Sequence, residues 1–308
     1  MLIAIIIITI VLIAVLAALY AVYYKVFYSP HRSYREIDDA EVSDDQSIRD
    51  TIRCSAVALS QREYEAVTTR AYDGVTLSGR YLHHRDGAPL CICFHGYRGS
   101  AVRDFSMMGP FLYEEGYNVL LVDERAHGRS GGHTITYGVR ERRDVLSWVG
   151  YASNRFGADM PIYLFGISMG AATVLMASGL KLPDNVRAIA ADCPYSSPKD
   201  VILYVCGRIG LNPALCWPLI RAAAHLYGRF NVNAVTAEDA VKRTTKPILI
   251  IHGEDDTYVP APMSEQVYRA NPAMIERHTF PKAEHGLSYF FGTARYQEIV
   301  RDFLRRHP

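Results

Sequence analysis

The chain has 308 residues, which suits one mid-sized domain with a short appendage, because a single hydrophobic core stops growing at about 250 to 300 residues. Hydrophobic residues make up 49% of the chain and charged residues 21%, which excludes a disordered or collagen-like protein. With 33 basic and 32 acidic residues the formal net charge is +1, so the chain lacks the strongly basic surface that nucleic-acid binding needs.

The run from Leu2 to Tyr24 carries no charged side chain and consists mostly of Ile, Leu, Val and Ala. As a helix its 23 residues extend about 34 Å, enough to cross the roughly 30 Å hydrocarbon core of a bilayer. A cleaved signal peptide is the alternative, but it has a basic start and a small-residue cleavage site, whereas only Met1 precedes this run and tyrosines close it. Residues 1–24 are therefore predicted to be an uncleaved transmembrane anchor.

Charged residues begin directly after the apolar run. The bases Lys25, Arg32 and Arg35 all lie on its C-terminal side, and by the positive-inside rule this places the rest of the chain in the cytoplasm. The stretch Glu36–Asp45 then carries six acids and no base, which is typical of a solvated segment. Residues 25–60 are therefore predicted to be a juxtamembrane acidic spacer.

From residue 61 onward, short apolar runs of strand type alternate with helical segments. This alternation predicts one α/β domain over residues 61–308, with a mostly parallel sheet covered by helices on both faces. The expected strands are Tyr64–Arg70, Leu77–His83, Pro89–Phe94, Tyr117–Val122, Pro161–Phe165, Val186–Ala191, Pro247–Ile251 and Ile275–Phe280. The expected helices are Asp104–Glu115, Val139–Asn154, Met169–Leu180, Ala261–Ala270 and Thr293–Arg306.

The six cysteines are too few for a disulfide scaffold in a chain of this length. Cys91 and Cys93 lie in one of the expected strands, where thiols usually behave as small core residues. A Cys-x-Cys pair can also bind a metal ion, but no second cysteine or histidine pair stands at the spacing of a zinc site. The sequence therefore predicts no metal and no other cofactor.

The interval from about residue 196 to 245 separates two expected strands and exceeds the usual length of a connection. It is predicted to form a short helical cap. Its apolar and aromatic residues either line a pocket for an acyl group or bury a small core within the cap, and the two readings are equally weighted. These residues are Ile202, Leu203, Tyr204, Leu211, Trp217, Leu219, Ile220, Leu226, Tyr227 and Phe230.

The pentapeptide Gly166–Gly170 (GISMG) lies between an expected strand and an expected helix. This is the strand-turn-helix context of a Gly-x-Ser-x-Gly nucleophile elbow, in which the glycines let strand and helix pass closely and the serine hydroxyl stays exposed. Ser168 is the candidate nucleophile. Because a serine hydroxyl needs a base to take its proton, the motif alone is weak evidence, and partners must be found elsewhere in the chain.

Two later segments supply such partners, and with them the sequence resembles the α/β-hydrolase superfamily. The segment His252–Pro260 (HGEDDTYVP) is similar to the His-Gly-x-x-Asp-x-x-Val-Pro that often carries the acid of the superfamily's Ser-Asp-His triad. The resemblance implies Asp256 as the acid, with Asp255 and Glu254 as the alternatives. It implies His285, which follows the last expected strand, as the base that accepts the serine proton.

Two further loops follow expected strands. The segment His95–Ser100 (HGYRGS) resembles the superfamily's His-Gly-x-x-Gly oxyanion loop. The resemblance implies that the oxyanion hole consists of the backbone N–H groups of Tyr97 and Met169. The segment Asp123–Gly132 (DERAHGRSGG) resembles another superfamily motif and is interpreted as structural, with Arg125 paired inside the domain; a substrate contact by His127 is the alternative.

The resemblance covers about residues 61–308 and extends to bacterial membrane-anchored or cytosolic hydrolases of the serine aminopeptidase and acyl-hydrolase branches. It implies an α/β-hydrolase fold and a serine hydrolase of the carboxylesterase type that acts on a small-molecule acyl ester. The predicted membrane anchor suggests a lipid ester. Peptidase and thioesterase activities use the same triad, and the fold can also serve as a non-catalytic receptor or binding protein, so these alternatives stay open.

Overall fold

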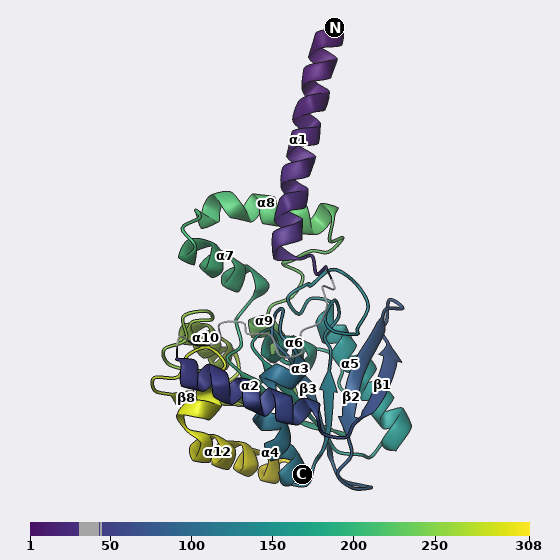
Figure 1. Cartoon of the computed structure of the whole chain (residues 1–308), viewed down its shortest axis with the longest axis vertical. Helices are drawn as coiled ribbons and strands as arrows, with labels where there is room; N and C mark the ends of the chain where they lie inside the picture. The colour runs from purple at the N-terminus through teal and green to yellow at the C-terminus, as the bar shows by residue number, and fades with distance from the viewer. Residues whose placement is uncertain (31–42, 44) are drawn as a thin grey trace.

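The computed structural model describes residues 1–30, 43 and 45–308 (Figure 1). Apart from residues 43 and 45, the acidic stretch Glu36–Asp45 lies outside the described residues, so its predicted role as a solvated spacer stays a prediction.

The structure differs from the predicted spacer at its C-terminal end, where Gln46–Ser60 forms helix α2. Ile52, Ala56 and Leu59 of this helix are buried. They are spaced at i, i+4 and i+7, so they form one apolar stripe that packs on the domain. The prediction for residues 25–60 rested on the acidic residues just before this helix, so the apolar stripe of the helix was not recognised.

A sheet of eight strands forms the centre of the molecule, in the order β1-β2-β4-β3-β5-β6-β7-β8. Strands β3 to β8 are parallel to their neighbours within this group, and β1 and β2 are antiparallel to theirs. All eight predicted strands are present, with ends within two residues of those expected. They are β1 (Glu65–Arg70), β2 (Thr76–Leu82), β3 (Leu90–Phe94), β4 (Asn118–Val122), β5 (Ile162–Ile167), β6 (Val186–Asp192), β7 (Ile248–Gly253) and β8 (Ile275–Phe280).

Helices cover both faces of the sheet, as predicted (Figure 1). One face is covered by α5 (Glu141–Phe156), α6 (Met169–Ser178), α9 (Ala237–Val241) and α10 (Ala261–Ala270). The other is covered by α2, α3 (Ala101–Asp104), α4 (Met108–Glu114), α11 (Ser288–Phe291) and α12 (Thr293–Arg306). The single helix expected over Asp104–Glu115 is thus two helices, α3 and α4, of which the first begins earlier at the capping residue Ser100.

The central strands are apolar on both sides because each side faces a layer of helices. In β3, Ile92 packs into the cluster on one face, whereas Cys91 and Cys93 pack into the cluster on the other. Burial raises the pKa of both thiols, so both are protonated core residues.

The interval 196–245 contains α7 (Pro198–Arg208), α8 (Pro213–Leu226) and α9. Helices α7 and α8 pack against each other and stand beyond the sheet in Figure 1, whereas α9 packs on α6. The ten apolar residues singled out in this interval divide into three groups. The buried ones are Ile202, Ile220 and Phe230; the half-buried ones are Leu203, Trp217 and Tyr227; the exposed ones are Tyr204, Leu211, Leu219 and Leu226.

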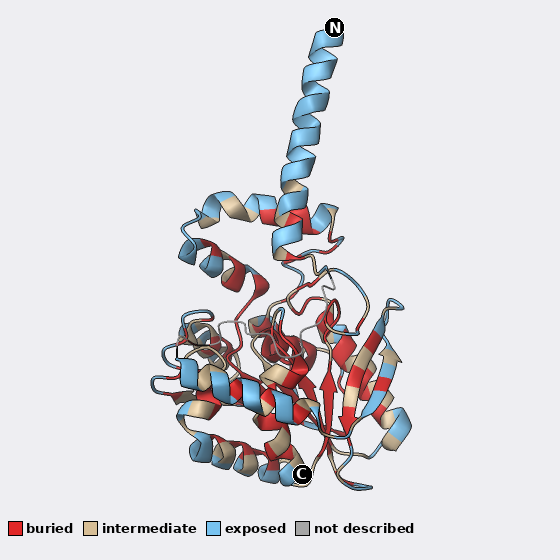
Figure 2. Ribbon diagram, in the orientation of Figure 1, coloured by how far each residue is buried: buried red, intermediate tan, exposed pale blue. Residues whose placement is uncertain are grey.

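Helix α1 (Leu2–Val26) projects away from the domain, and every residue from Leu2 to Ala18 is exposed (Figure 2). Among the described residues it is the one helix long and apolar enough to cross a bilayer. Its final turn behaves differently, because Tyr23 and Phe27 are buried in the core cluster that also contains α6 and α8 residues.

Candidate active site

Ser168 stands at the turn between β5 and α6, with backbone angles φ 55° and ψ −113°. A positive φ is strained for a residue with a side chain, and here the flanking glycines hold it in place. A Cβ atom on Gly166 would lie 2.3 Å from the carbonyl oxygen of Gly170, and one on Gly170 would lie 2.0 Å from the carbonyl oxygen of Phe94. The strand, turn and helix therefore pass at distances that exclude any side chain, and the serine projects from the turn.

The structure brings the three predicted triad residues together although they are distant in sequence. The Ser168 hydroxyl donates to Nε2 of His285 at 2.8 Å, and Nδ1–H of His285 donates to Oδ2 of Asp256 at 2.7 Å. The two alternative acids, Glu254 and Asp255, are exposed on the same loop. Only Asp256 among these three carboxylates contacts the imidazole in the described chain.

Asp256 is buried and held by the turn that follows β7. Its Oδ1 accepts hydrogen bonds from the backbone N–H groups of Tyr258 at 2.9 Å and Val259 at 2.8 Å, and its Oδ2 also accepts one from His252 Nε2–H at 3.2 Å. Burial alone would raise the pKa of this carboxyl, but the charge of His285 and the hydrogen bonds outweigh it and hold the pKa well below its usual value. The side chain is therefore a fixed carboxylate.

His285 responds to this carboxylate. Burial lowers the pKa of the imidazole, whereas the charge of Asp256 and its hydrogen bond raise it, and the net result is a raised pKa. The site thus stabilises the imidazolium form that His285 adopts when it takes a proton.

The loop after β3 is held in place by a half-buried ion pair. Arg103 Nε donates to Oδ1 of Asp104 at 2.8 Å, and the backbone N–H of Gly96 donates to Oδ2 of Asp104 at 2.7 Å. Among the hydrogen bonds of the described residues, none uses the N–H of Tyr97 or of Met169. Met169 is the first residue of α6, where a backbone N–H has no partner within the helix.

Two histidines shape the same loop. His95 Nε2 accepts from the N–H of Glu124 at 3.0 Å, and its Nδ1–H donates to the carbonyl of Gly96 at 2.8 Å. His127 Nε2 accepts from the N–H of Arg98 at 2.9 Å. Both rings are thus engaged with backbone groups, which favours the structural interpretation of His127 over a substrate contact.

Arg125, in the loop after β4, is paired inside the domain as the sequence predicted. It donates to both carboxylate oxygens of Asp144 at 2.6 Å and to Asp73 at 2.9 Å. A bidentate pair of this kind fixes the loop relative to α5 and to the β1–β2 turn.

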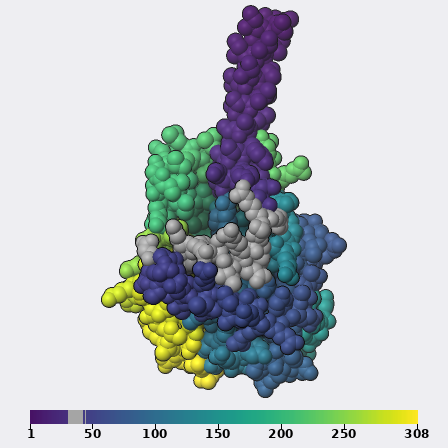
Figure 3. Space-filling view, in the orientation of Figure 1, coloured from purple at the N-terminus to yellow at the C-terminus, as the bar shows by residue number. Residues whose placement is uncertain are grey.

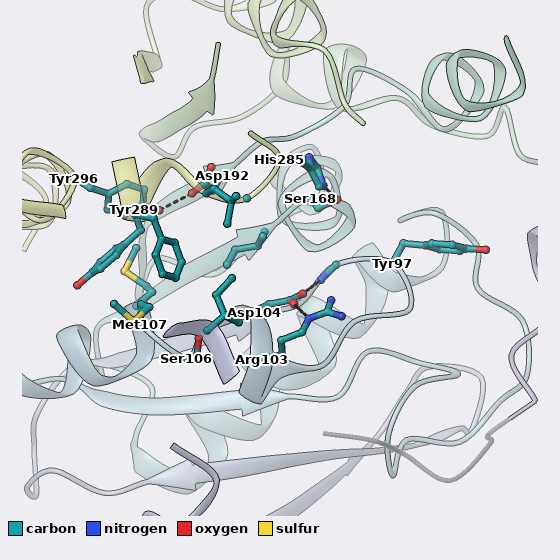
Figure 4. Close-up of a pocket in the computed structure, with 17 residues that line it drawn as sticks. Tyr97, Arg103, Asp104, Ser106, Met107, Ser168, Asp192, His285, Tyr289 and Tyr296 are labelled. Atoms are coloured by element: carbon teal, nitrogen blue, oxygen red, sulfur yellow. Dashed lines mark hydrogen bonds and ion pairs between the residues drawn. The ribbon is translucent and has the colours of Figure 1, made fainter. Parts of the chain in front are cut away.

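A cavity of about 140 Å³ opens beside Ser168 (Figure 4). Its wall comes from α2, from the loops around α3 and α4, from the end of β6 and from the segment at α11 and α12. Its lining residues are Ile52, Gly96, Tyr97, Arg103, Asp104, Ser106, Met107, Met108, Ile167, Ser168, Asp192, His285, Gly286, Leu287, Tyr289, Phe290 and Tyr296. None of the described residues 196–245 lines it, so the acyl pocket that was one reading of the cap residues is not this cavity.

Asp192 is a lining residue that the sequence analysis did not single out. It ends β6, and its Oδ2 accepts a hydrogen bond from the Tyr296 hydroxyl at 2.9 Å, whereas its buried Oδ1 has no hydrogen-bond partner among the described residues (Figure 4). Burial raises its pKa to about 6, against the effect of the Tyr296 hydrogen bond. An acid directly after a buried parallel strand lies at the edge where ligands bind, and that position was the available signal.

Comparisons with known proteins agree with this architecture. Residues 89–205 match the family model described as alpha/beta hydrolase fold, and residues 161–298 match the dienelactone hydrolase family. The chain is an α/β-hydrolase-fold protein. The predicted fold class and the predicted resemblance are both confirmed.

Relatives include proteins with and without an assigned activity. The uncharacterized protein YqkD of Bacillus subtilis is 29% identical over 80% of this chain and 81% of its own length. The lysophosphatidylserine lipase ABHD12 of Danio rerio is 26% identical over 71% of this chain, which spans 59% of that lipase. An esterase of Pyrococcus furiosus superposes with a TM-score of 0.66 and 25% identity, over 82% of this chain and 93% of the esterase.

Proposed function

We propose that this α/β hydrolase is a serine hydrolase that cleaves an acyl ester through an acyl-enzyme intermediate. The observation that carries the proposal is the continuous hydrogen-bond chain from Asp256 through His285 to Ser168, which ends on a serine held in a strained turn. An ester is favoured over an amide or a thioester because the relatives with printed activities include an esterase and a lipase.

In the first half of the reaction, the Ser168 oxygen attacks the ester carbonyl carbon while His285 Nε2 takes the hydroxyl proton. The carbonyl oxygen becomes an oxyanion, and the N–H groups of Tyr97 and Met169 donate to it. When the tetrahedral intermediate collapses, the bond to the alcohol breaks and the imidazolium returns its proton to the leaving oxygen. The acyl group is then bonded to Ser168.

In the second half, a water molecule replaces the alcohol. His285 takes one water proton as the water oxygen attacks the acyl carbon, and the proton passes to the Ser168 oxygen as the acid leaves. Asp256 keeps the Nδ1–H tautomer in place throughout and stabilises the imidazolium in each half. The triad therefore returns to its starting state.

For the N-terminal helix we propose an uncleaved single-pass anchor, with the catalytic domain in the cytoplasm. The burial of Phe27 and Tyr23 supports retention of the helix, because cleavage after it would expose core side chains. Lys25 directly after the apolar run supports the orientation. Protease added to intact cells is expected to leave the domain uncut, and digestion from outside would contradict the cytoplasmic placement.

A fluorophosphonate probe tests the catalytic proposal, because it reacts with an activated serine. We expect the wild-type protein and the control Ser47→Ala, which changes an exposed serine of α2, to be labelled equally, and Ser168→Ala to remain unlabelled. A folded wild-type protein that takes no label, or equal labelling of Ser168→Ala, would overturn the proposal.

A further inference from the structure

Helix α8 has a second apolar face that no part of the described chain covers. Leu215, Leu219 and Leu226 follow one another at i, i+4 and i+11, so they share one side of the helix, and they are 71%, 50% and 46% exposed. Ile220 and Ala224 lie on the other side of the helix and are buried. A helix that is apolar on both sides needs an apolar environment on both.

Further exposed apolar residues lie on α7, which packs against α8, and on the turn that joins the two helices. Val205, Ile209 and Leu211 are exposed there. We define the outer apolar face as Val205, Ile209, Leu211, Leu215, Leu219 and Leu226. Exposed apolar residues gathered on neighbouring helices mark an interaction site on a soluble protein or contact with a membrane.

The segment that carries most of the outer apolar face has charges of one sign. From Val201 to Ala237 the chain carries three arginines and no Asp or Glu. Basic residues beside an apolar helix face are typical of helices that lie in the interface of a bilayer, where phosphate groups are the nearest counter-charges.

The position of α8 along α1 identifies the bilayer as the partner. The Tyr227 hydroxyl, just after α8, donates to the carbonyl of Leu16, and the Tyr227 ring lies 5.3 Å from the ring of Tyr20. Leu16 precedes Lys25, the first charged side chain of the helix, by nine residues, or about 13 Å of helix. The Tyr227 ring also lies 5.9 Å from the ring of Tyr23, so α8 crosses α1 at the level of the tyrosines that mark headgroup level (Figures 1 and 3).

We propose that the outer apolar face lies in the leaflet that α1 enters, so that the hydrolase takes its ester from the bilayer itself. This inference rests on the proposed anchor and deepens the proposed function, since it names a membrane lipid ester as the substrate class. Interfacial helices sit about 5 to 10 Å into the boundary between headgroups and acyl chains, the level at which the ester bonds of a glycerolipid lie.

The end of α1 is also joined to the loop beside Ser168. The Tyr97 hydroxyl donates to the carbonyl of Val26, and the Arg98 guanidinium donates to the carbonyl of Lys25, both at 2.9 Å. Tyr97 lines the cavity at Ser168 as well. These contacts hold the site in a fixed position relative to α1, in contrast to a domain that a flexible linker joins to its anchor.

The two tryptophans of the chain measure the depth of α8 directly. Trp217 lies in α8 and is half-buried, whereas Trp148 is buried in the core beneath the sheet. In vesicles of phosphatidylcholine brominated on its acyl chains, the full-length protein is expected to lose about a third of its tryptophan fluorescence relative to unbrominated vesicles. The control Trp217→Phe, which keeps only Trp148, is expected to lose none.

Hydrolysis separates the inference from the proposed function. Leu219→Asp is expected to lower hydrolysis of a vesicle phospholipid ester at least about ten-fold and to leave hydrolysis of a soluble acetate ester unchanged. Val57→Asp, a matched change at an exposed position of α2, is expected to change neither rate. Unquenched wild-type protein that still cleaves the soluble ester would overturn the inference alone. Quenched protein that cleaves no ester would overturn the proposed function, and with it the substrate class, while the membrane contact of α8 would stand.

Discussion

The core around Ser168 and the outer layer formed by α1, α7 and α8 are both rich in Leu, Ile, Val and Ala, yet these residues do opposite things in the two regions. In the core they are buried between the sheet and its helices, and at Gly170 even one added carbon would collide with the backbone of β3. In the outer layer the same residue types are exposed, from Leu2 to Ala18 and along α8. An apolar composition therefore indicates that a segment needs an apolar environment. Only the packing shows whether the protein itself supplies that environment.

The largest effect expected of a polar change in the core is that of Asp256→Asn. An asparagine keeps the shape but does not stabilise the imidazolium or fix its tautomer, so we expect kcat to fall by about 10⁴-fold for a soluble ester. The neighbouring Asp255 is exposed, and Asp255→Asn is the matched control with no expected loss. Equal activity of the two variants would show that Asp256 is not the triad acid.

The same pair of variants predicts a pH dependence. His285 must be neutral to accept the serine proton, and Asp256 raises its pKa, so kcat/KM of the wild-type protein should rise with pH through a pKa above 6.5. In Asp256→Asn the charge is gone and the apparent pKa should fall, whereas Asp255→Asn should keep the wild-type profile. An upward shift in Asp256→Asn would contradict the assigned electrostatics.

The boundary between the two regions runs through the last turns of α1, and two alanine substitutions locate it. Phe27 is fully buried against Tyr137 and Phe230, so Phe27→Ala is expected to destabilise the domain by about 3 to 5 kcal/mol. Ile8→Ala, in the exposed part of the same helix, should leave the unfolding temperature of the domain in detergent micelles unchanged. Equal melting temperatures for both variants would place the whole of α1 outside the folded domain.

A smaller effect is expected at Asp192, the buried acid of the cavity wall. Its folded-state pKa, about 6, lies above the ordinary 3.8, so the folded protein holds this proton more tightly than the unfolded chain. The resulting stabilisation is complete below about pH 4 and is lost as the pH rises through 6. Asp192→Asn should therefore gain on the order of 1 to 3 kcal/mol over the wild-type protein between pH 4 and 7, measured by thermal unfolding. A gain that is the same at both pH values would contradict a raised pKa.

The sequence predicted most of the core because its signals are local. Eight apolar runs marked the strands, and the spacing of glycines around Ser168 marked the turn. The positions of Asp256 and His285 could be expected only from resemblance, since nothing local shows that two loops 88 and 117 residues after Ser168 meet at this serine. Their contact depends on the parallel register of β5 to β8.

The outer layer and the cavity were predicted less well, for a physical reason. Whether Leu219 or Ile202 of the cap is buried depends on which side of its helix meets the domain, and apolar residues on both sides leave the sequence pattern ambiguous. Ile52 of α2 lines the cavity. It was not expected there because residues 25–60 were predicted to be a spacer on the basis of their acidic residues. Asp192 ends β6, at the edge of the sheet where ligands bind, but it belongs to no motif that would have singled it out.

Ser168 is proposed to carry the acyl group during turnover. Full-length protein mixed with a chromogenic acyl ester, quenched in acid within the first turnovers and digested, can be examined by peptide mass spectrometry. We expect an added acyl mass on the peptide that contains Ser168 in the wild-type protein and no such mass in Ser168→Ala. Turnover with the acyl mass on a different residue, or at the wild-type rate in Ser168→Ala, would contradict this proposal.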